Sequence, residues 1–218
     1  MKLTKVLSCI FLTAFTAGLF TSANAQSERK IYLNEGFGSY ATNLHSIEGY
    51  TIADEAYFNI TDLNEYNKGA YFTEGASPSI TKTFEEKTDA RLVLSMVVQT
   101  YGKLPSFNVN LMDGTSPTMV LAVNSGKISL NNNKSIGYIG SNKTTRIDLV
   151  MDNTCGRVSV YIDGRMKTKE WSVKSFKKSY DGISVVQNSS NAPFAIDNIS
   201  VYSGKEPDKS IVENLHNK

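Results

Sequence analysis

The sequence is poor in the residues that cross-link or catalyse in small exported proteins. Its 218 residues include two Cys, two His, five Pro and one Trp. Cys9 lies in a segment that we expect to be removed on export, so Cys155 remains as a single thiol that cannot form an internal disulfide. Stability must then come from core packing or a bound metal. A half-buried turn position is favoured for Cys155 over a reactive thiol, because no His lies nearby in the sequence.

The chain also lacks an excess of charge of either sign. The full sequence has 23 Lys and Arg against 21 Asp and Glu, and loss of Lys2 and Lys5 with the leader leaves 21 of each. Nucleic acids and anionic membrane surfaces both need a clear basic excess. The composition therefore predicts no nucleic-acid partner and no attachment to an anionic membrane.

Short catalytic motifs are missing as well. His45 follows the first expected strand and His216 lies near the end of the chain, so the sequence proposes no Ser-His-Asp arrangement. There is no Cys/His cluster with zinc spacing and no Gly-rich phosphate loop. A lyase that used Tyr, Lys or Arg on a sheet face would leave no short motif, so catalysis stays open as an alternative.

Residues 1–25 are typical of an export signal. Lys2 and Lys5 precede an apolar run from Val6 to Phe20, and Ala23-Asn24-Ala25 has the form of a cleavage site. The apolar run is too short for a stable membrane anchor. We therefore expect a secreted or periplasmic protein cleaved after Ala25, with no membrane insertion, a domain over residues 26–204 and a polar tail over 205–218.

The mature chain is composed of short alternating runs separated by Gly, Asn, Asp, Ser and Pro clusters, with no long stretch of helical period. About a dozen such strands at regular spacing predict an all-β fold, a two-sheet antiparallel β-sandwich of the jelly-roll type. Arg91–Val98 is the most continuously apolar run and is expected at the centre of a sheet. Extended runs are expected at about 30–33, 50–61, 69–73, 79–84, 91–100, 106–112, 118–123, 127–130, 145–151, 157–162, 182–186 and 194–202.

Three segments carry a family resemblance. They are Leu33–Phe37, Asp148–Gly164 with its Tyr-Ile-Asp-Gly turn, and Phe194–Tyr202, which reads Phe-Ala-Ile-Asp-Asn-Ile-Ser-Val-Tyr. In this order they resemble the concanavalin A-like (laminin G-like) jelly-roll domains of secreted bacterial proteins. The resemblance covers nearly the whole mature chain and implies the same sandwich architecture.

The resemblance also implies a structural calcium. Related sugar-binding sandwiches commonly hold this ion between their first and last strands. By position the ligands would be Glu35 and Asp197, completed by Asn34 or backbone carbonyls, a donor set that suits calcium. The alternative is that Asp197 caps a turn and Glu35 is solvated.

Secreted glucanases of this fold place three acids at alternate positions of one strand, so that all of them face one cleft. This sequence has no such triplet. Asp148 and Asp152 are four residues apart on one expected strand, and we expect both to be solvated rather than catalytic.

Glycan binding needs flat aromatic surface beside amides or carboxylates. Tyr101, Tyr138 and Trp171 are the foremost candidates because they lie in or beside expected loops or edges. Tyr40 and Tyr180 are further candidates, and the Asn131–Asn133 run offers amides. Packing at a sheet rim is the alternative role for each aromatic residue.

The sequence thus favours a secreted, non-catalytic module that binds a polysaccharide or other glycan, with calcium as its structural cofactor. A polysaccharide-degrading enzyme or its accessory domain is the alternative. A purely structural or adhesive domain is a third possibility, and the sequence gives no oligomeric state.

Overall fold

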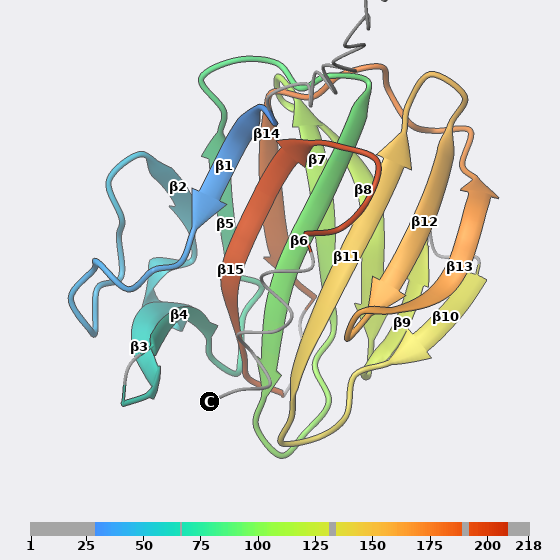
Figure 1. The fold of residues 1–218 in the computed structure, drawn as a ribbon. Coiled ribbons are helices and arrows are strands. Elements are labelled where there is room, and N and C mark those ends of the chain that lie inside the picture. Colours follow the sequence, from blue (N-terminus) through green and yellow to red (C-terminus); the bar gives the residue numbers. More distant parts are fainter. Residues whose placement is uncertain (1–28, 66, 131–133, 189–191, 209–218) are drawn as a thin grey trace, which may run out of the picture.

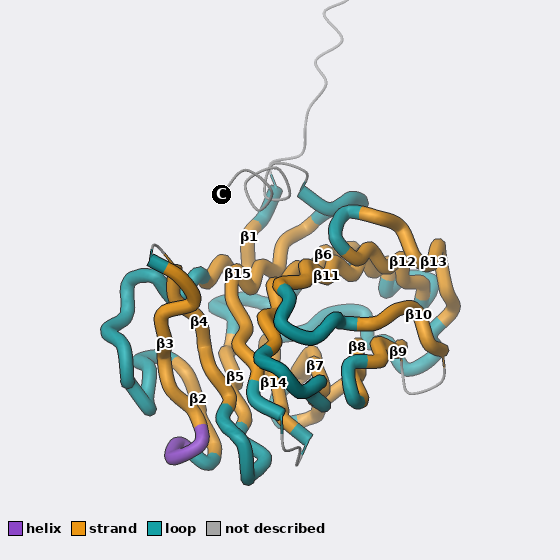
Figure 2. The backbone as a smooth tube through the Cα atoms, turned by 90° about the horizontal axis from the view of Figure 1, so that it is seen from below, coloured by secondary structure: helices purple, strands orange, loops and turns teal. Residues whose placement is uncertain are grey.

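The computed structural model describes residues 29–65, 67–130, 134–188 and 192–208. They form two antiparallel sheets stacked face to face, as the sequence predicts (Figure 1). The two layers are clearest in the view from below, where β1, β15, β6, β11, β12 and β13 lie over β5, β14, β7, β8 and β9 (Figure 2). The expected signal peptide lies outside the described residues. Within the described part, no helix is long and apolar enough to cross a membrane.

The larger sheet, sheet A, has eight strands in the order β13-β12-β11-β6-β15-β4-β3, with β1 also paired to β15. Its strands are β1 (Ile31–Glu35), β3 (Phe58–Asn64), β4 (Asn67–Phe72), β6 (Arg91–Thr100), β11 (Thr144–Asp152), β12 (Arg157–Ile162), β13 (Arg165–Ser172) and β15 (Phe194–Ser203). The apolar β6 lies between β11 and β15, which confirms its central position.

Sheet B has seven strands in the order β10-β9-β8-β7-β14-β5-β2. They are β2 (Tyr50–Ala53), β5 (Ser79–Thr83), β7 (Phe107–Asp113), β8 (Ser116–Asn124), β9 (Lys127–Leu130), β10 (Lys134–Tyr138) and β14 (Gly182–Gln187). A single 3-10 turn, η1 (Glu55–Tyr57), links β2 to β3 and thereby joins the two sheets.

The edge of β15 is shared by two strands, and this positions a buried acid. Strand β4 pairs with the first part of β15 through Ile196, and β1 pairs with the last part from Ile199 onward. Between them β15 bulges at Asn198, which has a φ of 49°. A bulge of this kind re-aims the side chains beside it, and here it lies next to Asp197.

The core between the sheets contains a column of aromatic rings. Phe194 of β15 stacks on Phe72 with a centroid distance of 4.7 Å and on Phe107 of sheet B at 4.5 Å. Phe58 meets Phe72 edge to face at 5.6 Å. All four side chains are fully buried, so the column ties sheet A to sheet B across the interior.

Two strands were not expected from the sequence, and one expected strand is divided. The run 50–61 is broken at Asp54, whose φ of 55° turns the chain into η1. Strand β10 begins directly after the Asn131–Asn133 run, which lies outside the described residues. Strand β13 has seven exposed or solvent-facing positions around one buried Thr168, so it lacks the apolar alternation of a half-buried strand.

Candidate functional site

The outer face of sheet A carries the candidate site. Alternation along β11 places Ile147, Leu149 and Met151 in the core, so the residues between them face outward. The same holds for Arg157 and Ser159 on β12. At the end of β11 where Asp152 pairs with Arg91 of β6 and Arg157 of β12, this outer face is hollowed.

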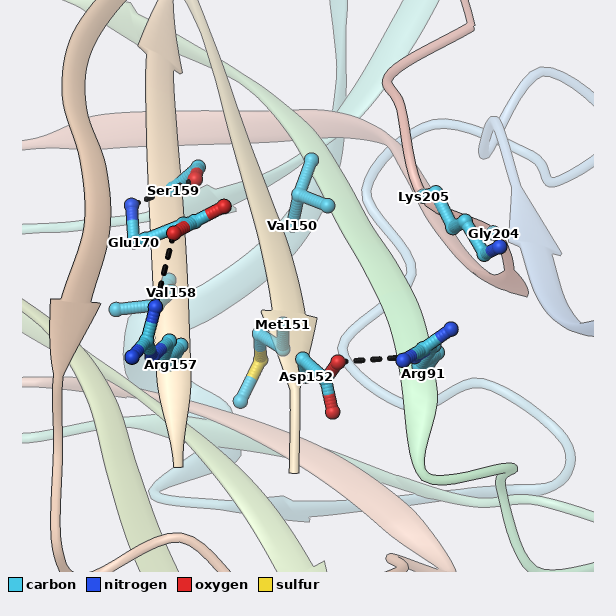
Figure 3. A pocket seen from close by; sticks show the side chains of 10 residues that line it. All are labelled: Arg91, Val150, Met151, Asp152, Arg157, Val158, Ser159, Glu170, Gly204 and Lys205. Atoms are coloured by element: carbon cyan, nitrogen blue, oxygen red, sulfur yellow. Dashed lines mark hydrogen bonds and ion pairs between the residues drawn. The ribbon is translucent and has the colours of Figure 1, made fainter. Parts of the chain in front are cut away.

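The hollow, here called the outer-face pocket, has a volume of about 270 Å³ and is lined by ten residues of β6, β11, β12, β13 and the segment after β15 (Figure 3). The outward side chain of Val150 supplies apolar atoms, while Ser159 supplies a hydroxyl. The pocket therefore combines a small apolar surface with charged and polar groups around it.

Two Arg–carboxylate pairs stand on opposite sides of the pocket (Figure 3). The Nε of Arg91 lies 2.9 Å from the Oδ2 of Asp152, and the Nη1 of Arg157 lies 2.9 Å from the Oε2 of Glu170. Three of these four side chains are more than half exposed, and Asp152 is 28% exposed. Exposed pairs of this kind contribute only about 0–1 kcal/mol to stability. Their donors and acceptors can therefore be shared with a ligand at little cost to the fold.

Asp152 is poorly suited to act as a general acid. Asp152 accepts hydrogen bonds from the hydroxyl and the N–H of Thr154 and pairs with Arg91, which together hold its pKa below the usual range. A glycosidase needs one carboxyl with a raised pKa to protonate the leaving group. In the pocket both acids are engaged by arginine, which suits hydrogen bonding to hydroxyl groups better than proton transfer.

Of the three foremost aromatic candidates, none lines the outer-face pocket. Trp171 directly follows Glu170, but it pairs across the ladder with the core residue Val158, so its side chain lies on the inner side of sheet A, where it is 40% exposed at the edge strand. Tyr101 and Tyr138 lie at the opposite end of the sandwich. Tyr101 follows β6 and meets Tyr71 at 5.5 Å, and Tyr138 ends β10 with 68% exposure. The structure therefore does not bring the three aromatic residues together.

The other aromatic candidates are used by the fold. Tyr180 is fully buried and accepts a hydrogen bond from the N–H of Lys177, so it is not available to a ligand. Tyr40 is half-buried, packs against the core and donates its hydroxyl to Glu35.

Two sequence expectations about reactive groups are wrong in detail. Asp148 is fully buried rather than solvated, and it pairs with Arg146, which lies two residues earlier on the same outward side of β11 and is also buried. Cys155 lies in the β11–β12 turn as expected, but it is exposed rather than half-buried. Asp152 begins the β11–β12 turn by accepting a hydrogen bond from the Thr154 N–H.

The pocket residues Arg91, Arg157 and Glu170 were not singled out from the sequence. The sequence does contain a usable signal, because the Asp163-Gly164 dipeptide is typical of a tight hairpin turn. In the structure both residues have the positive φ that such a turn requires. Extending the pairing symmetrically away from that turn continues a strand beyond Arg165 and brings Glu170 near Arg157 and Ser159. The structure shows this as an ion pair and as a hydrogen bond from the Glu170 N–H to the Ser159 hydroxyl.

A second group of polar residues gathers where β1 and β4 share the edge of β15. Glu35 accepts from the Phe37 N–H and from the hydroxyls of Tyr40 and Tyr50. Asp197 is 1% exposed, and its Oδ2 accepts from the amides of Asn67 and Asn198. The two sequence-predicted calcium ligands thus occupy neighbouring strands.

Asp197 is the group in this cluster whose charge is least compensated. Its Oδ1 is buried and makes no hydrogen bond within the described residues. Burial, opposed by the hydrogen bonds from Asn67 and Asn198 and reinforced by the charge of Glu35, raises the pKa of Asp197 to about 6. A cation beside Oδ1 would offset both effects. The described residues contain no group of three or more Asp, Glu, His or Cys, so such a cation would take further ligands from amide, backbone or water oxygens.

Comparisons with known proteins identify the fold but no family. No family model matches the chain, and no curated protein matches it. Among solved structures, the chain is similar to a sialidase with a TM-score of 0.59, 10% identity and coverage of 80% of this chain and 18% of that one. It is also similar to the binding domain of botulinum neurotoxin serotype G, with a TM-score of 0.57, 14% identity and coverage of 85% and 50%.

A third similar structure is domain 4 of an extracellular arabinanase from Geobacillus stearothermophilus, solved with arabinotriose. Its TM-score is 0.53 at 19% identity, and the match covers 86% of this chain and 98% of that domain. The chain spans half or less of the sialidase and the toxin domain that it matches. At these identities the likeness shows a shared β-sandwich fold.

Proposed function

We propose that this chain is an exported, non-catalytic carbohydrate-binding domain and that the outer-face pocket receives the glycan. The observation that supports this most directly is the two exposed Arg–carboxylate pairs that face each other across a small apolar surface. One fold neighbour was solved with arabinotriose, and another is a toxin binding domain. The arabinotriose complex gives the same fold a precedent in saccharide recognition.

The chemistry of the pocket fits a saccharide. The guanidinium groups of Arg91 and Arg157 donate to ring and hydroxyl oxygens, while the carboxylates of Asp152 and Glu170 accept from hydroxyl groups. Because the polar groups stay on the surface, binding requires little desolvation of buried charge.

The calcium at the chain ends is the second part of the proposal. Glu35 and Asp197 would hold it, and the buried Oδ1 of Asp197 is the atom that most needs a partner. Calcium bound there would compensate two carboxylates and tie β1 to β15 where the chain has no disulfide. It would act on stability and would take no part in sugar recognition at the outer-face pocket.

The binding proposal is tested by a glycan array and polysaccharide depletion with the mature chain, residues 26–218, in calcium and in EDTA. Selective retention on one or more glycans is expected. No retention on any glycan would overturn the proposal. Release of reducing ends, or of an unsaturated product that absorbs in the ultraviolet, would identify an enzyme instead.

A matched pair of variants locates the site. Glu170→Gln removes the charged acceptor that pairs with Arg157, and we expect it to weaken glycan binding by about tenfold, since a hydrogen bond to a charged group contributes about 1.5–3 kcal/mol. Glu74→Gln is the control, because Glu74 is also an exposed acid in a surface pair, with Lys103 at 3.4 Å. Equal affinities of the two variants, measured by titration calorimetry, would place the glycan elsewhere.

A further inference from the structure

A short segment after β15 folds back over the outer face of sheet A. We call residues Gly204–Asp208 the strap. It leaves β15, crosses β6 toward β11 and β12, and returns, as the red loop in front of sheet A in Figure 1 shows. The Gly204 N–H donates to the Arg91 carbonyl, and Gly204 and Lys205 line the outer-face pocket. The strap is therefore one wall of the pocket.

The far end of the strap is held by Asp208. Its N–H donates to the Tyr202 hydroxyl at 2.8 Å, its carbonyl accepts from the Nη2 of Arg146 at 3.1 Å, and its carboxylate pairs with Arg29. These contacts join the strap to β15, to β11 and to the N-terminal side of β1. They are polar contacts, so breaking them exposes groups that water can solvate.

Beneath the strap lies the most deeply buried ion pair of the described residues. Arg146 and Asp148 are 1% and 0% exposed, and both Nε and Nη2 of Arg146 contact the same carboxylate oxygen, Oδ1, at 2.8 and 2.7 Å. They occupy outward positions of β11, so what buries them lies on the solvent side of the sheet and not in the core between the sheets. Tyr161, the cross-strand partner of Asp148, borders the pair.

Two buried polar atoms of this ion pair are unsatisfied. The Nη1 of Arg146 and the Oδ2 of Asp148 are buried and have no hydrogen-bond partner within the described part of the chain. A buried ion pair is favourable only when its remaining donors and acceptors are satisfied. The unsatisfied Nη1 is a hydrogen-bond donor, and the unsatisfied Oδ2 is an acceptor. A hydroxyl group, which both accepts and donates, matches that combination.

Resting on the proposed function, we propose that Arg146 and Asp148 form a second saccharide subsite that the strap covers in this structure. Lifting the strap would open the outer-face pocket toward β11 and let one glycan chain contact both places. A sugar hydroxyl would then accept from Nη1 and donate to Oδ2, and the Tyr161 and Tyr202 rings would border the sugar. While the strap covers the pair, the Asp208 carbonyl accepts a hydrogen bond from the Nη2 of Arg146 and so keeps this donor from a ligand.

The test loosens the strap in the full mature chain. The double variant Arg29→Gln/Tyr202→Phe removes the contacts of Asp208 with the Arg29 side chain and the Tyr202 hydroxyl, and hydrogen exchange at the Asp208 amide verifies the loosening. The probes are arabinotriose, cellotriose and sialyllactose, titrated by calorimetry. The loosened variant is expected to bind the trisaccharide that the wild type prefers at least fivefold more tightly. Adding Asp148→Asn to the loosened variant is expected to abolish that gain.

Controls separate this inference from the proposed function. Because Asp148→Asn breaks a buried pair, melting temperatures are measured first and binding is measured well below the lowest of them. Glu170→Gln in the loosened background should reduce affinity while leaving the gain from loosening in place. If wild-type binding depends on Glu170 but the loosened variant binds no more tightly, the covered subsite is overturned and the proposed function stands. The Nη1 of Arg146 and the Oδ2 of Asp148 would then be assigned to a buried water. Absence of binding in every variant would overturn both proposals.

Discussion

Replacing Phe194 with Ala is expected to lower the free energy of unfolding by about 3–5 kcal/mol. Phe194 is fully buried and stacks on Phe72 of its own sheet at 4.7 Å and on Phe107 of the facing sheet at 4.5 Å. Removing its ring would leave a cavity at the point where the two sheets meet. For a domain of this size, the melting temperature should fall by roughly 10 °C or more.

The control for this prediction is Tyr138→Ala, which removes an aromatic ring that is 68% exposed. Its effect should stay within about 0.5 kcal/mol, as is usual for surface substitutions. Urea denaturation of both variants measures the difference. Similar losses in the two variants would mean that the aromatic column does not hold the sheets together.

The second large effect is expected at Asp197, in the absence of calcium. Because its pKa is raised to about 6 in the folded protein and is about 4 in the unfolded chain, the folded protein binds the proton more tightly. Stability in EDTA should therefore fall as the pH rises from about 4 to about 6 and then level off. The loss should be about 2–3 kcal/mol. Asp197→Asn should remove this pH dependence and should make the calcium-free protein at least as stable as the wild type at pH 7.

Calcium should reverse the loss in the wild type only. Adding calcium at pH 7 should raise the wild-type melting temperature, with about 2.7 kcal/mol of stabilisation at one hundred times the dissociation constant. Asp197→Asn should show no such rise, while Asp62→Asn, at an exposed position of β3, should behave as the wild type does. A calcium response that survives in Asp197→Asn, or a wild type that ignores calcium, would remove the metal from the account.

The parts of the fold that depend on local pattern were predictable from the sequence. The bounds of β6, β9 and β12 agree with the apolar runs at 91–100, 127–130 and 157–162. The pairing register between strands was harder to predict from the sequence. Val120 and Ala122 have the spacing of one strand face, yet a shift in the β7–β8 ladder places Val120 in the core cluster and leaves Ala122 outside it. A bulge breaks the period of two without changing which residue types are present.

The candidate site was harder to predict because it depends on pairs that form across strands. Glu170 lies on the edge strand β13, where nearly every position is exposed and no apolar alternation marks the strand. Asp148 is buried together with Arg146 on the outer face of sheet A and not in the core. By contrast, Glu35 and Asp197 could be placed on neighbouring strands from the family resemblance. What the sequence did not reveal there is the unpartnered Oδ1 of Asp197, since it results from the bulge at Asn198.

The central claim is that a glycan binds at the outer-face pocket without being cleaved. Its most direct test is an amide nuclear magnetic resonance titration of the mature chain with the oligosaccharide that it retains best. We predict that the amides of Val150, Ser159 and Glu170 shift with increasing ligand while the ligand spectrum shows no new product. Shifts confined to sheet B, or the appearance of cleaved sugar, would contradict the account.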